Sequence, residues 1–180
     1  MSGEIPLPIA FLPQEAHGLA GRLGFAPAPG LWWIDPVRSP DRLLDGDLAS
    51  LRRSGATVLV TLLEEPEMAR IGLPDLVARA ERAGLEALWF PIPDGAAPDD
   101  LEATSSLVQR ILEHLAAGRT VVVHCHAGIG RSGTVVACCL VARGADPASA
   151  IDAVRKERPG AATAPGQEEF VHAFGRARAG

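Results

Sequence analysis

The sequence predicts an α/β fold in which a mostly parallel central sheet is flanked by helices on both faces. Short apolar runs rich in β-branched residues alternate along the chain with longer segments that carry apolar residues at helical spacing. One run, Val121–Val123, leads through a glycine-containing loop directly into a helical pattern. Strands that alternate with helices are typical of parallel sheets, because the connecting helices cover both faces.

The elements are assigned in chain order. Segment 1–30 is rich in Pro and Gly, and alternating apolar residues from Ile5 to Phe11 predict a strand that the prolines confine to the sheet edge. Further strands are predicted at residues 31–34, 56–63, 85–90 and 121–123. Helices are predicted at 41–53, 73–82, 101–118, 132–143 and 146–158, and a last helix bears Phe170, Val171 and Phe174. We expect one domain over residues 1–180, with 1–30 as its N-terminal edge segment, because this length suffices for one sizeable core.

Composition argues against several classes of partner. Apolar residues at 47% and charged residues at 22% describe an ordinary globular chain, and the net charge of −5 gives no reason to expect nucleic acid or a membrane surface as partner. Met1 to Leu12 lacks the features of a signal peptide. Three cysteines without the spacing of a disulfide framework favour a reducing, cytoplasmic location. We expect a monomer.

The loop from Cys125 to Arg131 joins the end of a buried strand to the start of a helix. Backbone N–H groups in such a loop can surround an oxyanion, and the helix N-terminus adds positive potential. Gly128 and Gly130 are expected to permit the backbone angles that this requires. The same surroundings favour the thiolate form of Cys125. The loop therefore predicts a phosphate site with a nucleophile in place.

The neighbours of Cys125 fit phosphate chemistry. Five residues separate it from Arg131, enough for the loop to curl so that the guanidinium meets two phosphoryl oxygens. Ser132 is expected beside the sulfur, where its hydroxyl can donate to the thiolate and ease the departure of sulfur from a phospho-enzyme. His124 is interpreted as a buried, hydrogen-bonded support of the loop, and His126 as part of its rim.

Other interpretations of Cys125 stay open. A buried core thiol explains neither the two glycines nor the Arg-Ser-Gly that follows. A metal site with His124 and His126 lacks further ligands, because no second Cys/His cluster is present and an extended segment points Cys125 away from both imidazoles. A rhodanese-type sulfurtransferase also carries a cysteine on an anion-binding loop. We expect neither metal nor cofactor.

A second loop, Pro91 to Asp99, follows a predicted strand at the sheet edge where α/β folds bind ligands. Asp94 in this loop is either the general acid that protonates a leaving oxygen or the first residue of an Asp-Gly turn. With the Cys125 loop present we favour the acid. Asp99 and Asp100 precede an apolar helical pattern and are expected to be N-caps.

The loop resembles the HCxxGxxRSG signature of the cysteine-dependent protein tyrosine phosphatase superfamily, which matches His124-Cys125 through Arg131-Ser132-Gly133. The stretch from Phe90 to Gly95 is similar to the compact dual-specificity branch, and within it to the kinase-associated phosphatase (cyclin-dependent kinase inhibitor) type. The resemblance implies a protein tyrosine phosphatase-like fold and a phosphate-binding loop made of His126, Ala127, Gly128, Ile129 and Gly130.

The resemblance also implies a two-step reaction on phosphotyrosine, phosphoserine or phosphothreonine in a protein or peptide. Cys125 attacks phosphorus, Arg131 holds the phosphoryl oxygens, Asp94 protonates the leaving group, and water then hydrolyses the cysteinyl-phosphate with help from Ser132. Gln167 either positions that water or is a polar residue at a helix N-terminus. The alternatives are the same chemistry on a small phosphate ester or phosphoinositide, and a catalytically silent phosphate-binding module.

Overall fold

The structure, a computed structural model, describes residues 6–31 and 40–179 and contains a five-stranded sheet. The strand order is β1-β2-β5-β3-β4; β1 pairs antiparallel with β2, and the other neighbours are parallel. The strands span Ala10–Phe11 (β1), Arg22–Ala26 (β2), Ala56–Thr61 (β3), Glu86–Trp89 (β4) and Thr120–His124 (β5). The predicted mostly parallel sheet is confirmed.

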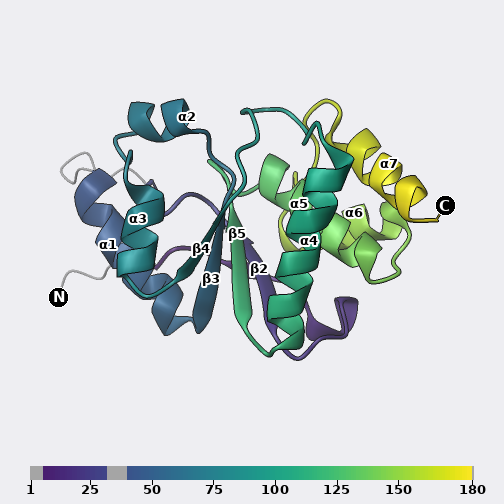
Figure 1. Cartoon of the computed structure of the whole chain (residues 1–180), viewed down its shortest axis with the longest axis horizontal. Coiled ribbons are helices and arrows are strands. Elements are labelled where there is room, and N and C mark those ends of the chain that lie inside the picture. Colours follow the sequence, from purple (N-terminus) through teal and green to yellow (C-terminus); the bar gives the residue numbers. More distant parts are fainter. Residues whose placement is uncertain (1–5, 32–39, 180) are drawn as a thin grey trace.

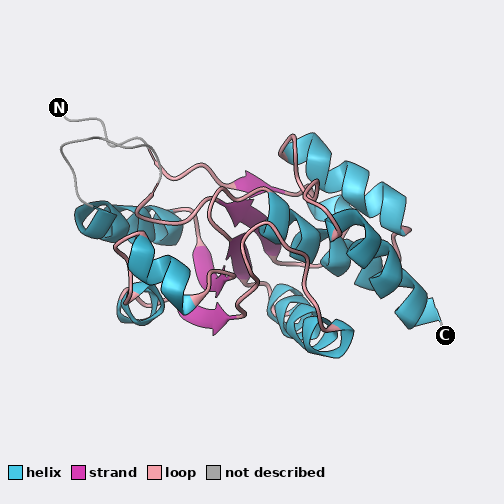
Figure 2. Ribbon diagram, turned by 90° about the horizontal axis from the view of Figure 1, so that it is seen from above, coloured by secondary structure: helices cyan, strands magenta, loops and turns pink. Residues whose placement is uncertain are grey.

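Helices cover both faces of this sheet, as predicted. Figure 1 shows α1 and α3 on one side and α4 to α7 on the other, and Figure 2 shows the same layers from above. The helices span Pro40–Arg53 (α1), Glu65–Arg70 (α2), Leu76–Arg82 (α3), Leu101–Ala116 (α4), Gly130–Ala142 (α5), Pro147–Glu157 (α6) and Gln167–Ala179 (α7). Among the described residues, no helix is long and apolar enough to cross a membrane.

Alternation along the central strand divides the core in two. Val121 and Val123 pack with the helices of the α4–α7 side, whereas Val122 packs with residues of α1 and α3 on the other face. All three are fully buried. A strand buried on both faces reads as a continuous apolar run, which is why β5 is visible in the sequence. It thereby fixes the position of the loop that follows.

The N-terminal segment differs from the prediction. The edge strand shrinks to Ala10–Phe11, and its partner β2 was not predicted because Gly24 weakens the strand pattern. A Cβ on Gly24 would lie 2.8 Å from side-chain atoms of Ile9 and Phe11, so glycine makes room for the edge strand. Of the strand predicted at 31–34, Leu31 lies outside any strand and residues 32–34 lie outside the described part of the chain.

Most other elements begin and end within a few residues of their predicted bounds. Helix α1 continues through Gly46 without a break, and Asp100 caps α4 by accepting a hydrogen bond from the Ala103 N–H at 2.9 Å. Helix α2 was not predicted, although Pro66 near its start and acidic residues in its first turn are helix N-terminal signals.

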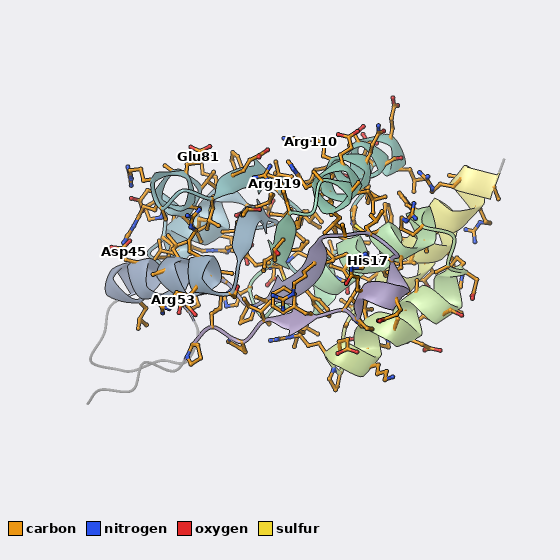
Figure 3. The ribbon with its side chains drawn as sticks, turned by 90° about the horizontal axis from the view of Figure 1, so that it is seen from below. His17, Asp45, Arg53, Glu81, Arg110 and Arg119 are labelled. Atoms are coloured by element: carbon orange, nitrogen blue, oxygen red, sulfur yellow. The ribbon has the colours of Figure 1, made fainter. Side chains whose placement is uncertain are left out.

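The two ends of the sheet differ in the residues that they carry. At the N-terminal ends of the strands, Arg119 donates hydrogen bonds to Glu86 in β4 and to the carbonyl of Thr57 in β3 (Figure 3). This end is therefore tied together by side chains. At the C-terminal ends, β3, β4 and β5 lead into the segments that carry Glu67, Asp94 and Cys125, as expected for ligand sites in open α/β sheets.

Candidate active site

Three segments that are distant in sequence meet in one pocket of about 380 Å³. They are the loop after β4, the loop between β5 and α5, and the segment that enters α7. The lining residues are Asp94, Gly95, Cys125, His126, Ala127, Ile129, Gly130, Arg131, Thr163, Ala164 and Gln167. The structure thus brings together most of the site residues that the sequence predicts, and it places Ser132 and His124 behind them.

Cys125 lies at the base of this pocket with only 3% of its surface exposed. Its Sγ is 3.5 Å from the Oγ of Ser132, which is itself fully buried at the start of α5. A hydroxyl at this distance can donate a hydrogen bond to a thiolate. The sulfur therefore has a hydrogen-bond donor beside it, and it lines the pocket.

His124 supports the loop from below. Its Nδ1 lies 3.1 Å from the carbonyl oxygen of Cys125, which can only accept, so Nδ1 carries the hydrogen. Its Nε2 then accepts a hydrogen bond from the Thr61 hydroxyl at 2.9 Å. Burial lowers the pKa of His124 to about 4, so the imidazole is neutral near pH 7. The side chain thus joins the ends of β3 and β5.

Carbonyl groups of the phosphate loop, residues 125–131, are held from outside. Their partners are His124 for Cys125, the Ala28 N–H for His126, the Arg158 guanidinium for Ala127, and the Ala162 and Gly133 N–H groups for Ile129. In a trans peptide the C=O and the following N–H point in opposite directions. The N–H groups that follow these carbonyls therefore turn towards the hollow of the loop, where an anion would sit.

The two loop glycines have different functions. Gly128 has a φ of +68°, and a Cβ there would lie 2.2 Å from the carbonyl carbon of Ala26, so both the backbone angle and the space demand glycine. Gly130 was predicted to serve the backbone angle as well, which is wrong, because its φ is outside the left-handed region. A Cβ on Gly130 would lie 2.9 Å from Nε2 of Gln167, so it provides space.

Arg131 is oriented by a carboxylate that the sequence analysis did not assign to the site. Its Nη1 donates to Glu67 Oε2 at 2.7 Å and its Nη2 donates to Glu67 Oε1 at 2.9 Å. Nη1 also donates to the Ile92 carbonyl and Nη2 to Asp94 Oδ1, both at 2.9 Å. The side chains of Arg131 and Glu67 are 2% and 3% exposed, so the ion pair is almost completely shielded from solvent.

Each member of this pair holds the other in its charged form. Burial by itself would raise the pKa of Glu67, but hydrogen bonds and charge from Arg131 outweigh it and lower the pKa below its ordinary value. Burial would lower the pKa of Arg131, but the hydrogen bonds to Glu67, together with the charges of Cys125, Glu67 and Asp94, outweigh that effect and raise the pKa. Glu67 lies on α2, 64 residues before Arg131. Local sequence signals do not connect residues so far apart.

Asp94 is the exposed member of the site, with 70% of its side chain accessible. The Phe90 N–H donates to the Thr61 carbonyl and the Ile92 N–H donates to the Leu62 carbonyl. These bonds continue the pairing of β4 with β3 past the end of β4 and fix the chain up to Ile92. Beyond that point Asp94 leans over the pocket and accepts its hydrogen bond from Arg131. Asp94 is therefore a solvent-exposed residue of the pocket, whereas Cys125 is a buried one.

Gln167, the first residue of α7, is buried and joins two loops. Its Nε2 donates to the Ala96 carbonyl at 2.9 Å, and its Oε1 accepts from the Ala164 N–H at 3.1 Å. The amide therefore ties the loop of Asp94 to the segment before α7, directly above Gly130.

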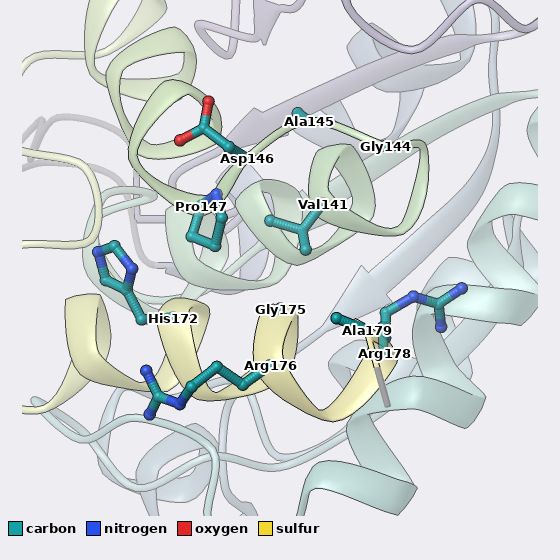
Figure 4. A pocket seen from close by; sticks show the side chains of 10 residues that line it. All are labelled: Val141, Gly144, Ala145, Asp146, Pro147, His172, Gly175, Arg176, Arg178 and Ala179. Carbon is teal, nitrogen blue, oxygen red and sulfur yellow. The ribbon is translucent and has the colours of Figure 1, made fainter.

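Other groups lie apart from this pocket. A second hollow of about 540 Å³, between α5, α6 and α7, shares no lining residue with it (Figure 4). Cys138 and Cys139 are buried in α5, and burial raises the pKa of the Cys139 thiol to about 12. Within residues 6–31 and 40–179, no group of three or more His, Cys, Asp or Glu side chains is placed to hold a metal ion.

Comparisons with known proteins show which family the chain resembles. Residues 40–145 match a family model described as a polymorphic toxin system DSP-PTPase phosphatase. Rat cyclin-dependent kinase inhibitor 3 is 28% identical over 174 residues, covering 95% of this chain and 80% of that protein. A crystal structure of kinase-associated phosphatase, with its catalytic-site cysteine replaced by serine, superposes with a TM-score of 0.87 at 26% identity over 98% of both chains.

A structure of PTPMT1 in complex with PI(5)P is also similar, with a TM-score of 0.63 at 30% identity over 72% of this chain and 85% of that one. The family model covers more than half of the chain, including the segment from α2 through the phosphate loop to the end of α5. The chain therefore belongs to the dual-specificity and protein tyrosine phosphatases (DSP-PTPase family), and it is a cysteine-dependent phosphatase.

Proposed function

We propose that this phosphatase hydrolyses phosphotyrosine and phosphoserine/threonine monoesters in proteins through a cysteinyl-phosphate on Cys125. The observation that carries the proposal is the convergence of the Cys125 sulfur, the Arg131 guanidinium and the Asp94 carboxyl group on one pocket. A nucleophile, an anion holder and a proton donor are the three groups that phosphoryl transfer to a thiolate requires.

In the first step the Cys125 thiolate attacks phosphorus, and the bond from phosphorus to the leaving oxygen breaks. Loop N–H groups and Arg131 hold the equatorial oxygens, whose charge they offset as the transition state forms. The leaving oxygen takes a proton from the Asp94 carboxylic acid. This step yields a free hydroxyl group on the substrate, a cysteinyl-phosphate and the Asp94 carboxylate.

In the second step water attacks the cysteinyl-phosphate and gives its proton to the Asp94 carboxylate. The bond between sulfur and phosphorus breaks, and sulfur leaves as a thiolate that the Ser132 hydroxyl stabilises by hydrogen bonding from 3.5 Å. Inorganic phosphate then departs. The cycle regenerates both the thiolate and the carboxylic acid.

The contact between Arg131 and Asp94 explains how the acid becomes available. Both hydrogens on Nη2 of Arg131 are engaged, one by Glu67 and one by Asp94. A phosphoryl oxygen that binds Arg131 replaces the Asp94 oxygen, while the Glu67 pair remains in place. The displaced carboxyl group then lies next to the leaving oxygen of the bound ester.

Protein substrates are favoured over lipid ones. The similarity to kinase-associated phosphatase supports a phosphoprotein, whereas the PTPMT1 complex supports a phosphoinositide as second candidate. The variable positions of the loop hold His126 and Ile129 and no lysine, so the loop itself offers little additional charge to a multiply phosphorylated headgroup. We also propose one phosphatase domain over residues 1–180, acting as a cytoplasmic monomer, where reducing conditions keep Cys125 free.

Hydrolysis without added metal tests the proposal. Phosphotyrosyl and phosphothreonyl peptides are compared with PI(5)P, a soluble inositol phosphate and a nucleotide, using wild type and Cys125→Ser. We expect the highest kcat/KM on a peptide and none in the variant. Faster turnover of PI(5)P would shift the assignment to lipid, and phosphopeptide binding without turnover by wild type would leave only a binding module.

A further inference from the structure

Arg158, directly after α6, reaches back to the phosphate loop. Its Nη2 donates to the carbonyl oxygen of Ala127 at 2.9 Å, across 31 residues of sequence. The other loop carbonyls that have partners are held by backbone N–H groups, by His124, the neighbour of Cys125, or by the hydroxyl of Thr134 in α5. Ala127 alone among these carbonyls depends on a long charged side chain from another part of the fold.

The peptide group between Ala127 and Gly128 is the one whose orientation most needs such a partner. Glycine populates positive and negative φ about equally, so a peptide group that precedes glycine can rotate at little cost. Gly128 stands at φ +68°. With the Ala127 carbonyl drawn outward by Arg158, the Gly128 N–H must point the opposite way, into the anion cradle. Rotation of this peptide would instead aim a carbonyl oxygen at the phosphate.

The charge of Arg158 lies close to the phosphate loop, because its guanidinium contacts the Ala127 carbonyl two residues after Cys125. Burial lowers the pKa of its guanidinium, and the charge of a Cys125 thiolate opposes this shift. The Nε of Arg158 is buried and has no hydrogen-bond partner among the described residues. Among the described residues, the Ala127 carbonyl is therefore the hydrogen-bond partner that holds the guanidinium.

We propose that Arg158 is a positioning residue of the phosphatase: it fixes the Ala127–Gly128 peptide so that the Gly128 N–H binds the phosphoryl group, and it places a second positive charge at the loop carbonyl two residues after Cys125. This inference rests on the proposed phosphate site around Cys125. It adds a residue to that site, because Arg158 lies outside the signature loop and does not line the pocket.

Substitution of Arg158 tests the proposal against a matched control. Arg158→Met keeps an apolar stem and removes the guanidinium, whereas Lys156→Met removes an exposed charge from the last turn of α6, two residues earlier. We expect Arg158→Met to lower kcat/KM for an aryl phosphate by about 10- to 100-fold and to weaken competitive inhibition by inorganic phosphate similarly. Alkylation of Cys125 by iodoacetamide should need higher pH in Arg158→Met. Lys156→Met should behave as wild type in all three.

Arg158→Lys separates the two functions of the side chain. An ammonium group keeps the charge but lacks the fork that reaches Ala127, so the alkylation profile should return towards wild type while kcat/KM stays low. If Arg158→Met matches Lys156→Met in turnover and in phosphate inhibition, the positioning role is refuted.

A measurement on the unmodified protein guards against a variant that does not fold. In an NMR titration with inorganic phosphate, the Gly128 amide resonance should shift as strongly as those of the other loop N–H groups. A Gly128 amide that does not respond while its neighbours do would overturn the inference. Phosphate binding with a Gly128 response in a protein without turnover would support the inference while refuting the proposed catalysis.

Discussion

Glu67 and Arg131 form a buried, two-pronged ion pair, with N–O distances of 2.7 and 2.9 Å. The pair fixes the plane of the guanidinium before any substrate arrives. Fixing it in advance lowers the entropic cost of aligning Arg131 with a phosphoryl group. The short helix α2 thus has a function at the site although it contributes nothing to the pocket lining.

Replacement of Glu67 by glutamine should separate this positioning from simple folding. Glu67→Gln keeps the shape of the side chain but removes its charge and one acceptor, so Arg131 keeps only one of its two hydrogen bonds to residue 67. We expect kcat/KM for an aryl phosphate to fall by about 10- to 100-fold and stability to fall by on the order of 3 kcal/mol, measured by urea unfolding. Glu65→Gln, exposed on the same helix, is the control. Equal kinetics in the two variants would refute the positioning function.

His124 should make stability depend on pH. Its pKa is about 4 in the folded protein and 6.5 ordinarily, so between these values the unfolded chain binds the proton and the folded chain does not. Stability therefore falls as pH decreases through this window, by up to about 3 kcal/mol for this group. Urea unfolding at pH 7 and pH 5 should show a smaller difference for His124→Asn than for wild type. The same pH difference in both proteins would contradict the assignment.

The space around Gly128 can be probed with alanine. Gly128→Ala and Gly144→Ala both place a side chain at positive φ, which costs about 1–2 kcal/mol. A Cβ at Gly144 meets nothing within 4 Å, whereas at Gly128 it collides with the backbone of Ala26 and Pro27. We expect both variants to unfold at lower temperature, and only Gly128→Ala to lose phosphate binding and turnover. Retention of activity in Gly128→Ala would show that the loop has more freedom than its packing indicates.

Gln167 should control the loop that carries Asp94. Gln167→Glu removes the donor to the Ala96 carbonyl, and it also changes any interaction with the water of the second step. We expect kcat to fall and a burst of leaving group to appear, because hydrolysis of the cysteinyl-phosphate becomes rate-limiting. Gln109→Glu, exposed on α4, is the control. An unchanged kcat without a burst would remove Gln167 from the second step.

Short-range patterns made much of the fold and the site predictable. Val121–Val123 is an apolar run typical of a strand buried on both faces, and the loop up to Arg131 follows it directly. The predicted anion-binding loop therefore lies in one continuous segment of the sequence. The position of Asp94 at the pocket was predictable for a similar reason, because proline and glycine fix its loop just after a strand.

Residues that act across long sequence distances were not predictable. Glu67 is an ordinary acidic residue in a short helix until folding brings it 2.7 Å from Arg131. Arg158 is an ordinary basic residue after a helix until it meets the Ala127 carbonyl. Strand β2 was missed for a different reason. Glycine at position 24 makes room for neighbouring side chains, and it also interrupts the apolar pattern by which a strand is predicted.

The most direct test of the central claim is the pH–rate profile of kcat/KM for an aryl phosphate without added metal, measured for wild type, Cys125→Ser and Asp94→Ala. We predict a bell-shaped profile for wild type, no turnover for Cys125→Ser, and loss of the high-pH limb for Asp94→Ala, because that limb reports ionisation of the acid. Residual turnover in Cys125→Ser, or a high-pH limb that persists in Asp94→Ala, would contradict the assignment of nucleophile or acid.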